Sequence, residues 1–227
     1  MIDKRLLTGP FVQMDKSERI ENIVVMLHGY GSNGNDLIQI AHQWKDNFPK
    51  VFFSAPNAPF KFTGFHQGFM WFDVYPEGIP IDKASKKHQE KVMKDFNKSC
   101  DLIKQHIYNL SKEHNVSLSK LFLLGFSQGS MMSIEVGTIL NKSIAGIISL
   151  SGRIYSKDFY QRSRKKCPIL VVHGDNDNII PPSRFHETCE ILEKSGYNVE
   201  KYLMKNMGHS INNDVNEISK SFIKNYR

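Results

Sequence analysis

The sequence predicts an α/β fold, with a mostly parallel central sheet and helices on both of its faces. Short apolar runs alternate with helix-like segments along most of the 227 residues, and this alternation is typical of parallel strands joined by crossover helices. The runs are continuously apolar, which indicates strands that are buried on both faces. No repeat or linker divides the sequence, so we expect a single domain over residues 1–227.

Six apolar runs are strand candidates, because each is rich in residues that favour strands. They cover residues 23–27, 51–55, 121–124, 144–150, 169–172 and 199–204. The last run alternates more than the others, so we place it nearer an edge of the sheet. Helices are expected over about 36–46, 83–114, 128–140, 183–194 and 213–224.

Two segments fit neither class. Residues 56–80 contain four prolines, three glycines and seven aromatic side chains, which predicts a long aromatic loop passing over something apolar. Residues 151–166 are more polar and are expected to form an exposed loop.

The charge of the chain narrows the classes of function. The formal net charge is +7, from 30 Lys and Arg against 23 Asp and Glu. The densest basic run, 162–166, is short and lacks interleaved aromatic residues, which argues against a nucleic-acid-binding face. At low salt such a charge favours at most a weak peripheral contact with an anionic membrane.

Neither a targeting signal nor a disulfide framework is indicated. The first residues form no apolar signal segment, and no stretch approaches the ~18 apolar residues of a membrane span. Cys100, Cys167 and Cys189 are odd in number and widely spaced, so we expect them to be buried small side chains. We therefore expect a soluble cytoplasmic protein. The sequence leaves open whether it forms a homodimer.

The segment Gly125-Phe126-Ser127-Gln128-Gly129 places a serine between two glycines, after an apolar strand and before a helix. The G-x-S-x-G pattern alone is weak, but this context is typical of an elbow that exposes a serine hydroxyl at the carboxyl end of a sheet. Glycines are needed there because a Cβ would collide with the adjoining strand and helix. Ser127 is therefore predicted to be a nucleophile, the alternative being a turn with a solvated serine.

A serine hydroxyl needs a general base, and the base needs an orienting carboxylate. Asp175 and Asp177 follow the strand candidate 169–172, and His209 lies in a short turn after 199–204. Serine, acid and histidine in this chain order are typical of α/β-hydrolases. Each residue also has a structural explanation, since an aspartate caps turns and a lone histidine is more often a surface or core residue. From the residues alone, the choice between Asp175 and Asp177 stays open.

A glycine-rich turn, LHGYGSNG at residues 27–34, follows the first strand candidate. Such a turn lets backbone N–H groups face the negative charge that develops on a carbonyl oxygen, and a second donor comes from the residue after the nucleophile. We assign these donors to the backbone amides of Tyr30 and Gln128. A phosphate-binding loop is the alternative, but neither of its glycine patterns is present.

These motifs together resemble the phospholipase/carboxylesterase family of α/β-hydrolases, which includes small bacterial carboxylesterases and the acyl-protein thioesterases. The shared motifs are LHGYG, APNAP, WFD, GFSQG, HGDNDNIIP and GHS, in the family's order over nearly the whole chain. The resemblance implies an α/β-hydrolase fold, with Ser127 as nucleophile, His209 as general base and Asp177 as the third member. Asp175 then becomes a turn residue. Many members carry Leu in place of Tyr30, a departure that concerns the pocket beside the backbone donor.

We expect a serine hydrolase that cleaves carboxylic esters of short to medium acyl chains, with no metal or organic cofactor. A palmitoyl thioester on a protein, or a lysophospholipid, is the alternative substrate. Gly29, Trp71 and Phe72 are expected beside the substrate, with the two aromatic residues at the pocket rim, although aromatic residues there are equally suited to closing the end of the sheet.

A non-catalytic binding protein that kept the hydrolase fold is the alternative from another class, because a fold alone does not establish turnover. Against this alternative, every residue that the chemistry needs is present in the sequence.

Overall fold

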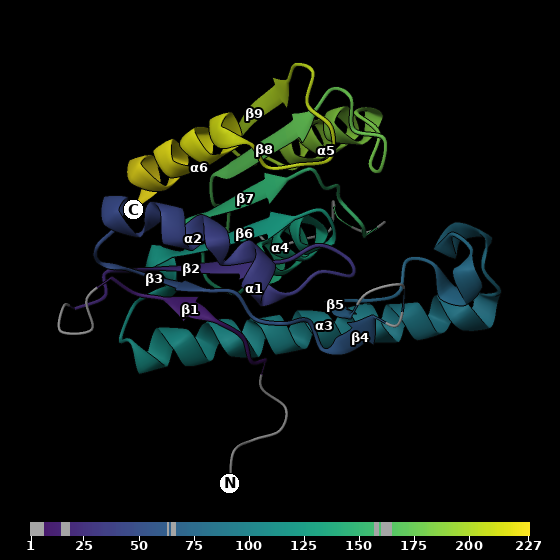
Figure 1. Cartoon of the computed structure of the whole chain (residues 1–227), viewed down its shortest axis with the longest axis horizontal. Coiled ribbons are helices and arrows are strands. Elements are labelled where there is room, and N and C mark those ends of the chain that lie inside the picture. Colours follow the sequence, from purple (N-terminus) through teal and green to yellow (C-terminus); the bar gives the residue numbers. More distant parts are fainter. Residues whose placement is uncertain (1–6, 15–18, 63, 65–66, 157–158, 160–164) are drawn as a thin grey trace, which may run out of the picture.

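The centre of the molecule is a mostly parallel sheet (Figure 1). The structure, a computed structural model, describes residues 7–14, 19–62, 64, 67–156, 159 and 165–227. Within them the sheet has seven strands in the order β1-β3-β2-β6-β7-β8-β9. The strands are β1 (Phe11–Val12), β2 (Asn22–Leu27), β3 (Val51–Ser54), β6 (Leu121–Phe126), β7 (Gly146–Leu150), β8 (Ile169–Gly174) and β9 (Val199–Met204). Only β1 pairs antiparallel, and β9 lies at an edge, so both the fold class and the edge position are confirmed.

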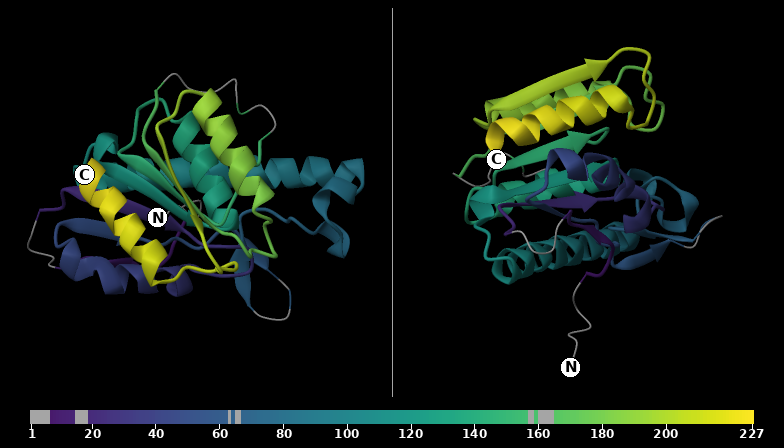
Figure 2. Two further views of the ribbon diagram at one scale, coloured as in Figure 1. Left: turned by 90° about the horizontal axis from the view of Figure 1, so that it is seen from above. Right: turned by 60° about the vertical axis from the view of Figure 1, so that its left-hand side comes forward.

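Helices cover both faces of this sheet (Figure 2). They are α1 (Gly34–Leu37), α2 (Gln39–Trp44), α3 (Lys86–Glu113), α4 (Gln128–Ile139), α5 (Ser183–Lys194) and α6 (Asn213–Tyr226). In β2, Ile23, Val25 and Leu27 pack in one core cluster with α3, α4 and α5. Val24 and Met26 pack in the other cluster, with α1, α2 and α6. Successive side chains of a strand point to opposite faces, so a strand covered on both sides has to be continuously apolar.

Two helices begin at other residues than the sequence predicts, while α4, α5 and α6 begin where expected. The helix expected over 36–46 begins at Gly34 and is divided into α1, α2 and a 3₁₀ turn, η1 (Lys45–Asn47). Asn33 sets its start, because its side chain accepts a hydrogen bond from the Asp36 amide. The long helix begins at Lys86 and not near residue 83, because Ser85 caps it by accepting from the His88 amide.

The segment 56–80 was predicted as a loop, but part of it is a β-hairpin. Strands β4 (Phe60–Phe62) and β5 (Gly68–Met70) pair antiparallel, and two 3₁₀ turns, η2 (Pro76–Gly78) and η3 (Ile81–Lys83), follow them. The hairpin docks on the turn after β2: the Gly31 amide donates to the Phe69 carbonyl at 2.9 Å, and the Phe69 amide donates to the Ser32 carbonyl at 2.8 Å. Each strand has three residues, too few for a clear alternation in the sequence.

The segment 151–166 is less exposed than its polarity predicted. Ser151, Gly152 and Phe159 are buried, and Gly152 packs behind the turn that carries Ser127. Most of the basic run 162–166 lies outside the described residues.

The three cysteine side chains are buried, as predicted. Among the described residues, no helix combines the length and the apolar character needed to cross a bilayer.

Candidate active site

Ser127 occupies the sharp turn between β6 and α4, as the sequence predicted. Its backbone angles, φ 55° and ψ −115°, lie outside the regions that L-residues prefer, at a typical cost of ~1–3 kcal/mol. The glycines on either side make the turn sterically feasible. A Cβ on Gly125 would lie 2.1 Å from the Gly129 carbonyl oxygen, and a Cβ on Gly129 would lie 1.8 Å from the Leu27 carbonyl oxygen.

The carboxyl end of β7 supports this turn from behind. The Ser127 amide donates to the Leu150 carbonyl at 2.9 Å, and the buried Ser130 and Ser149 hydroxyls lie 2.6 Å apart. Gly152 packs so closely that a Cβ would lie 2.2 Å from Ser130 Oγ. The strained conformation is therefore fixed by neighbouring strands and not by the local sequence alone.

Asp177 and His209 come from the ends of β8 and β9 and form a hydrogen-bonded pair. The His209 Nδ1–H donates to Asp177 Oδ2 at 2.7 Å, while Asp177 Oδ1 accepts from the Ile179 and Ile180 amides, both at 2.9 Å. Burial opposes ionisation of this carboxyl group, but the hydrogen bonds from His209 and the two amides outweigh it and hold the pKa of Asp177 below its ordinary value. The pair therefore keeps a charged acceptor beside the imidazole.

The other aspartate considered from the sequence, Asp175, makes no hydrogen bond to His209 among the described residues, and its Oδ1 is buried without a partner. A residue that the sequence analysis did not single out, His173, reaches Asp177 in its place. Its Nε2 lies 3.3 Å from Asp177 Oδ2 and 2.8 Å from the Ile180 carbonyl oxygen. Burial lowers the pKa of His173, so the neutral imidazole donates its Nε2–H to the Ile180 carbonyl and lies beside the carboxylate.

Ser127 and His209 line one cavity at the carboxyl ends of the strands. The ring of Phe126 lies beside the imidazole, with 4.8 Å between the ring centroids. No described residue hydrogen-bonds to the Ser127 hydroxyl, and such bonds often tighten only when substrate is bound. Because His209 Nδ1 donates to Asp177, its Nε2 is the nitrogen left to accept a proton.

The two amides assigned to an oxyanion site also belong to this cavity. Tyr30 and Gln128 both line it, and their backbone N–H groups donate to no acceptor among the described residues. Gln128 is the first residue of α4, where the helix dipole adds a partial positive charge. The Tyr30 hydroxyl donates to Asp73 Oδ1 at 2.7 Å, so its side chain anchors the turn to the segment after the hairpin.

Trp71 and Phe72 do not form the rim of the cavity, and that prediction is wrong. Both side chains are fully buried, and their backbone holds the buried Gln128 side chain instead. The Trp71 amide donates to Gln128 Oε1 at 3.0 Å, and Gln128 Nε2 donates to the Phe72 carbonyl at 2.6 Å. The Trp71 indole also donates to the His28 carbonyl at 2.9 Å. The aromatic pair therefore connects the two turns that carry the candidate oxyanion donors.

His28 is held as a neutral side chain beside Gly29, which lines the cavity. Its Nδ1–H donates to the Gly29 carbonyl at 2.8 Å, and its Nε2 accepts from the Ala58 amide at 3.0 Å. Burial is the main reason why the pKa of His28 falls to about 4. A Cβ on Gly29 would lie 3.4 Å from the Ser127 Cβ, so this position adjoins the nucleophile.

The cavity has a volume of about 440 Å³, within the range of small-molecule sites. Its apolar and aromatic wall consists of Tyr30, Val74, Tyr75, Pro80, Ile81, Phe126, Met131, Ile179 and Ile180. Two charged residues, Asp82 and Arg153, also line it. No sequence signal marked them, because they lie in irregular segments that only the fold brings to the site.

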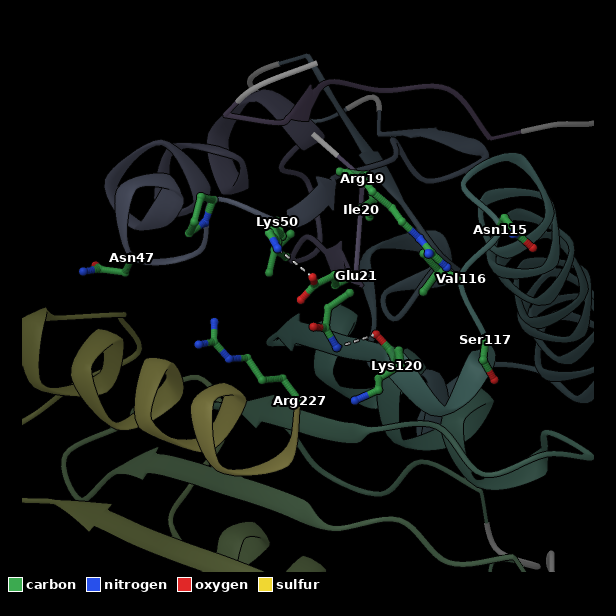
Figure 3. A pocket seen from close by; sticks show the side chains of 13 residues that line it. Arg19, Ile20, Glu21, Asn47, Lys50, Asn115, Val116, Ser117, Lys120 and Arg227 are labelled. Atoms are coloured by element: carbon green, nitrogen blue, oxygen red, sulfur yellow. Dashed lines mark hydrogen bonds and ion pairs between the residues drawn. The ribbon is translucent and has the colours of Figure 1, made fainter. Parts of the chain in front are cut away.

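A second and larger cavity, of about 670 Å³, lies at the amino ends of the strands (Figure 3). Its charged lining residues are Arg19, Glu21, Lys50, Lys120 and Arg227. Lys50 Nζ lies 2.8 Å from Glu21 Oε1, and both side chains are exposed. None of the predicted catalytic residues lines it.

Several known proteins are similar to this chain. The family described as Phospholipase/Carboxylesterase matches residues 8–226. An acyl-protein thioesterase 1 of Candida albicans is 29% identical over 216 residues, covering 89% of this chain and 90% of that protein. A crystal structure of esterase PE8 superposes with a TM-score of 0.85 at 29% identity, covering 98% of this chain and 100% of that one. A protein of Oryza sativa subsp. japonica that is named a probable inactive carboxylesterase is 25% identical over 197 residues, covering 83% of this chain and 78% of that protein.

Proposed function

We propose that this chain, which belongs to the phospholipase/carboxylesterase family, hydrolyses carboxylic esters of short to medium acyl chains through an acyl-enzyme on Ser127. The observation that carries the proposal is the convergence of Ser127 and the Asp177–His209 pair on one cavity. The cavity volume of about 440 Å³ supports a small ester, and its apolar wall supports an alkyl acyl chain.

In the acylation step, Ser127 Oγ attacks the carbonyl carbon of the ester while His209 Nε2 takes the hydroxyl proton. The carbonyl oxygen becomes an oxyanion, and the Tyr30 and Gln128 amides donate to it. As the intermediate collapses, the bond to the alcohol oxygen breaks and His209 gives its proton to the departing alcohol. Asp177 keeps the imidazole in the required tautomer and stabilises its charged form.

In the deacylation step, a water molecule attacks the acyl carbon and His209 takes its proton. The acid product leaves as the proton returns to Ser127 Oγ. Since Asp177 is held by two backbone amides as well as by His209, the geometry supports repeated turnover without rearrangement of the carboxylate.

Two further proposals concern substrate and location. The name of the Candida albicans relative, acyl-protein thioesterase 1, favours an acyl thioester on a protein as the second candidate substrate. The rates of hydrolysis of p-nitrophenyl esters from acetate to palmitate, and of a palmitoyl-thioester peptide, distinguish the two candidate substrates.

We also propose that the protein is a single-domain cytoplasmic enzyme. The family match over residues 8–226 supports the single domain, and the three buried cysteines fit a reducing compartment.

The test of the function is the variant Ser127→Ala, assayed with p-nitrophenyl butyrate and with a fluorophosphonate probe. We expect kcat/KM to fall by roughly a thousandfold or more and labelling to disappear, because only an activated serine reacts with the probe. Ser119→Ala removes a hydroxyl from the 3₁₀ turn η4 (Leu118–Lys120), which directly precedes the amino end of β6, and is expected to keep both properties. A wild-type protein that hydrolyses no ester and takes no label would instead support a non-catalytic member, of the kind that the Oryza sativa name describes.

A further inference from the structure

One cation lies in the wall of the otherwise mainly apolar catalytic cavity. Arg153 follows Gly152, whose backbone packs against the nucleophile turn so closely that a Cβ would lie 3.0 Å from the Ser127 carbonyl oxygen. Arg153 and Ser127 line the same cavity, and the guanidinium is partly buried. A group on a bound substrate can therefore reach the arginine while its ester carbonyl lies at the serine.

The neighbours of Arg153 do not neutralise it. Its Nη1 donates to the Ile154 carbonyl at 3.4 Å, a long contact, and its guanidinium lies 5.5 Å from the centroid of the Tyr155 ring. No ion pair joins it to a carboxylate among the described residues. Of the nearest charged side chains outside the cavity, Arg184 and Glu187 pair with each other at 2.7 Å.

Asp82 is the acidic residue of the cavity, but it is exposed on η3, so water screens its charge. Burial is the main reason why the pKa of Arg153 is lowered, and nearby Arg184 acts in the same direction. A guanidinium stays charged at any physiological pH and presents several N–H donors in one plane. A partly desolvated guanidinium without a carboxylate partner favours binding of an anion with two oxygens.

We propose that Arg153 binds an anionic group of the substrate, so that the preferred substrates are esters that carry a carboxylate or a similar oxyanion besides the ester group. This inference rests on the esterase function proposed above. The alkyl part of such a substrate lies along the apolar wall, and the anionic group lies at Arg153. The anion belongs either to the acyl part or to the alcohol part of the ester, and the two sources share the same chemistry at the guanidinium.

The test uses two matched pairs of substrates, in which a carboxylate is compared with its neutral carboxamide. The mono-p-nitrophenyl ester of adipic acid and its carboxamide place the group on the acyl side. Para-acetoxybenzoate and para-acetoxybenzamide place it on the alcohol side. For each pair, the ratio of the two kcat/KM values is measured in the wild type and in variants, so that the intrinsic reactivities of the esters cancel.

We expect Arg153→Gln to lower the carboxylate-to-carboxamide ratio about ten- to a hundredfold for one of the two pairs, through KM more than kcat. The pair that responds identifies the side of the ester. Arg153→Lys keeps the charge and is expected to retain a larger part of the ratio than Arg153→Gln. Arg184→Gln, which removes a nearby cation that is already paired with Glu187, is the matched control and is expected to leave both ratios unchanged.

A structural role of Arg153 alone would lower the rates on both members of a pair equally and leave the ratio constant. Unchanged ratios for both pairs in Arg153→Gln, in a protein that hydrolyses p-nitrophenyl butyrate, would overturn this inference while the esterase function stands. Absence of turnover with every ester in the wild type would overturn the esterase function and this inference with it. Thermal unfolding of the wild type and the three variants establishes that the comparison is made between folded proteins.

Discussion

The two ends of the central sheet carry two very different cavities. The one at the amino ends is larger, about 670 Å³ against about 440 Å³, and is lined by four cations and one carboxylate. Its Lys50–Glu21 pair is exposed, with 49% and 57% of the side chains accessible. At the carboxyl ends, the Asp177 side chain is inaccessible and is held by three short hydrogen bonds.

The larger and more charged cavity is thus not the one that holds the candidate catalytic residues. An exposed ion pair is worth little, because water and salt screen it and two long side chains lose freedom to form it. A buried polar group, in contrast, needs every hydrogen bond that it makes, so its position is fixed. Reactive groups are positioned by such contacts, and in open α/β sheets ligands bind beyond the carboxyl ends of the strands.

The largest effect on activity is expected from replacing Asp177, the candidate acid at the carboxyl ends of the strands. Asp177→Asn should lower kcat by about a thousandfold or more, because an amide at this place favours the wrong imidazole tautomer. Asp175→Asn, two residues away, should lower it by less than about tenfold, since Asp175 makes no hydrogen bond to His209 in the described structure. Steady-state kinetics with p-nitrophenyl butyrate measure both variants. The opposite ranking would assign the acid to Asp175.

The second prediction concerns pH and the buried His28. Its pKa is about 4 in the folded protein against 6.5 for the ordinary side chain, so below pH 6.5 the unfolded state binds more protons. The free energy of unfolding should therefore fall as the pH falls from 6.5 to about 4, with His28 contributing on the order of 3 kcal/mol. His106 is only partly exposed, and burial also lowers its pKa to about 4, so it acts in the same direction.

Urea unfolding at a series of pH values measures this dependence. His28→Gln should make it clearly flatter, while His42→Gln, at an exposed position of α2, should leave it as in the wild type. Equal slopes in His28→Gln and the wild type would contradict the role given to the buried imidazole.

The third prediction tests whether the buried Gln128 side chain supports the two turns that carry the Tyr30 and Gln128 amides. Gln128→Ala leaves the Trp71 amide and the Phe72 carbonyl without their buried partner, so it should destabilise the protein by about 2 kcal/mol. Activity should fall as well, because the candidate oxyanion donors lose their common support. Gln39→Ala removes an exposed side chain that also hydrogen-bonds to a backbone group, the Asn35 carbonyl, and should cost much less. Chemical denaturation compares the two variants, and equal losses would refute the argument from burial.

The smallest effect is expected at the amino ends. Glu21→Gln breaks the exposed Lys50 pair and should leave both the free energy of unfolding and kcat/KM nearly unchanged, because water and salt screen such a pair. Chemical denaturation of the variant and the wild type, at low and at high salt, measures the change in the free energy of unfolding. A large loss of stability or of activity would mean that this cavity is coupled to the reaction, so that the two ends of the sheet would not differ in this respect.

Most of the fold could be predicted from the sequence, because long buried strands require continuous apolar runs. The six long strands were found in this way, with bounds that differ by one or two residues in most cases. The hairpin β4–β5 was missed because its strands are too short to show a period, and it is stabilised by the turn on which it docks. The sequence predicts Trp71 and Phe72 at the cavity rim, but both are buried. Aromatic composition does not show which way a side chain points.

The sequence by itself determined the chemistry that is available: a serine between glycines, a downstream acid and histidine, and glycine-rich turns at the ends of apolar runs. These are local properties, set by steric clashes and by the order of residues along the chain. Only the tertiary structure decided which aspartate reaches His209 and that Arg153 lines the same cavity as Ser127. Such contacts join segments tens of residues apart, and their geometry depends on how the strands align and pack, which no local pattern encodes.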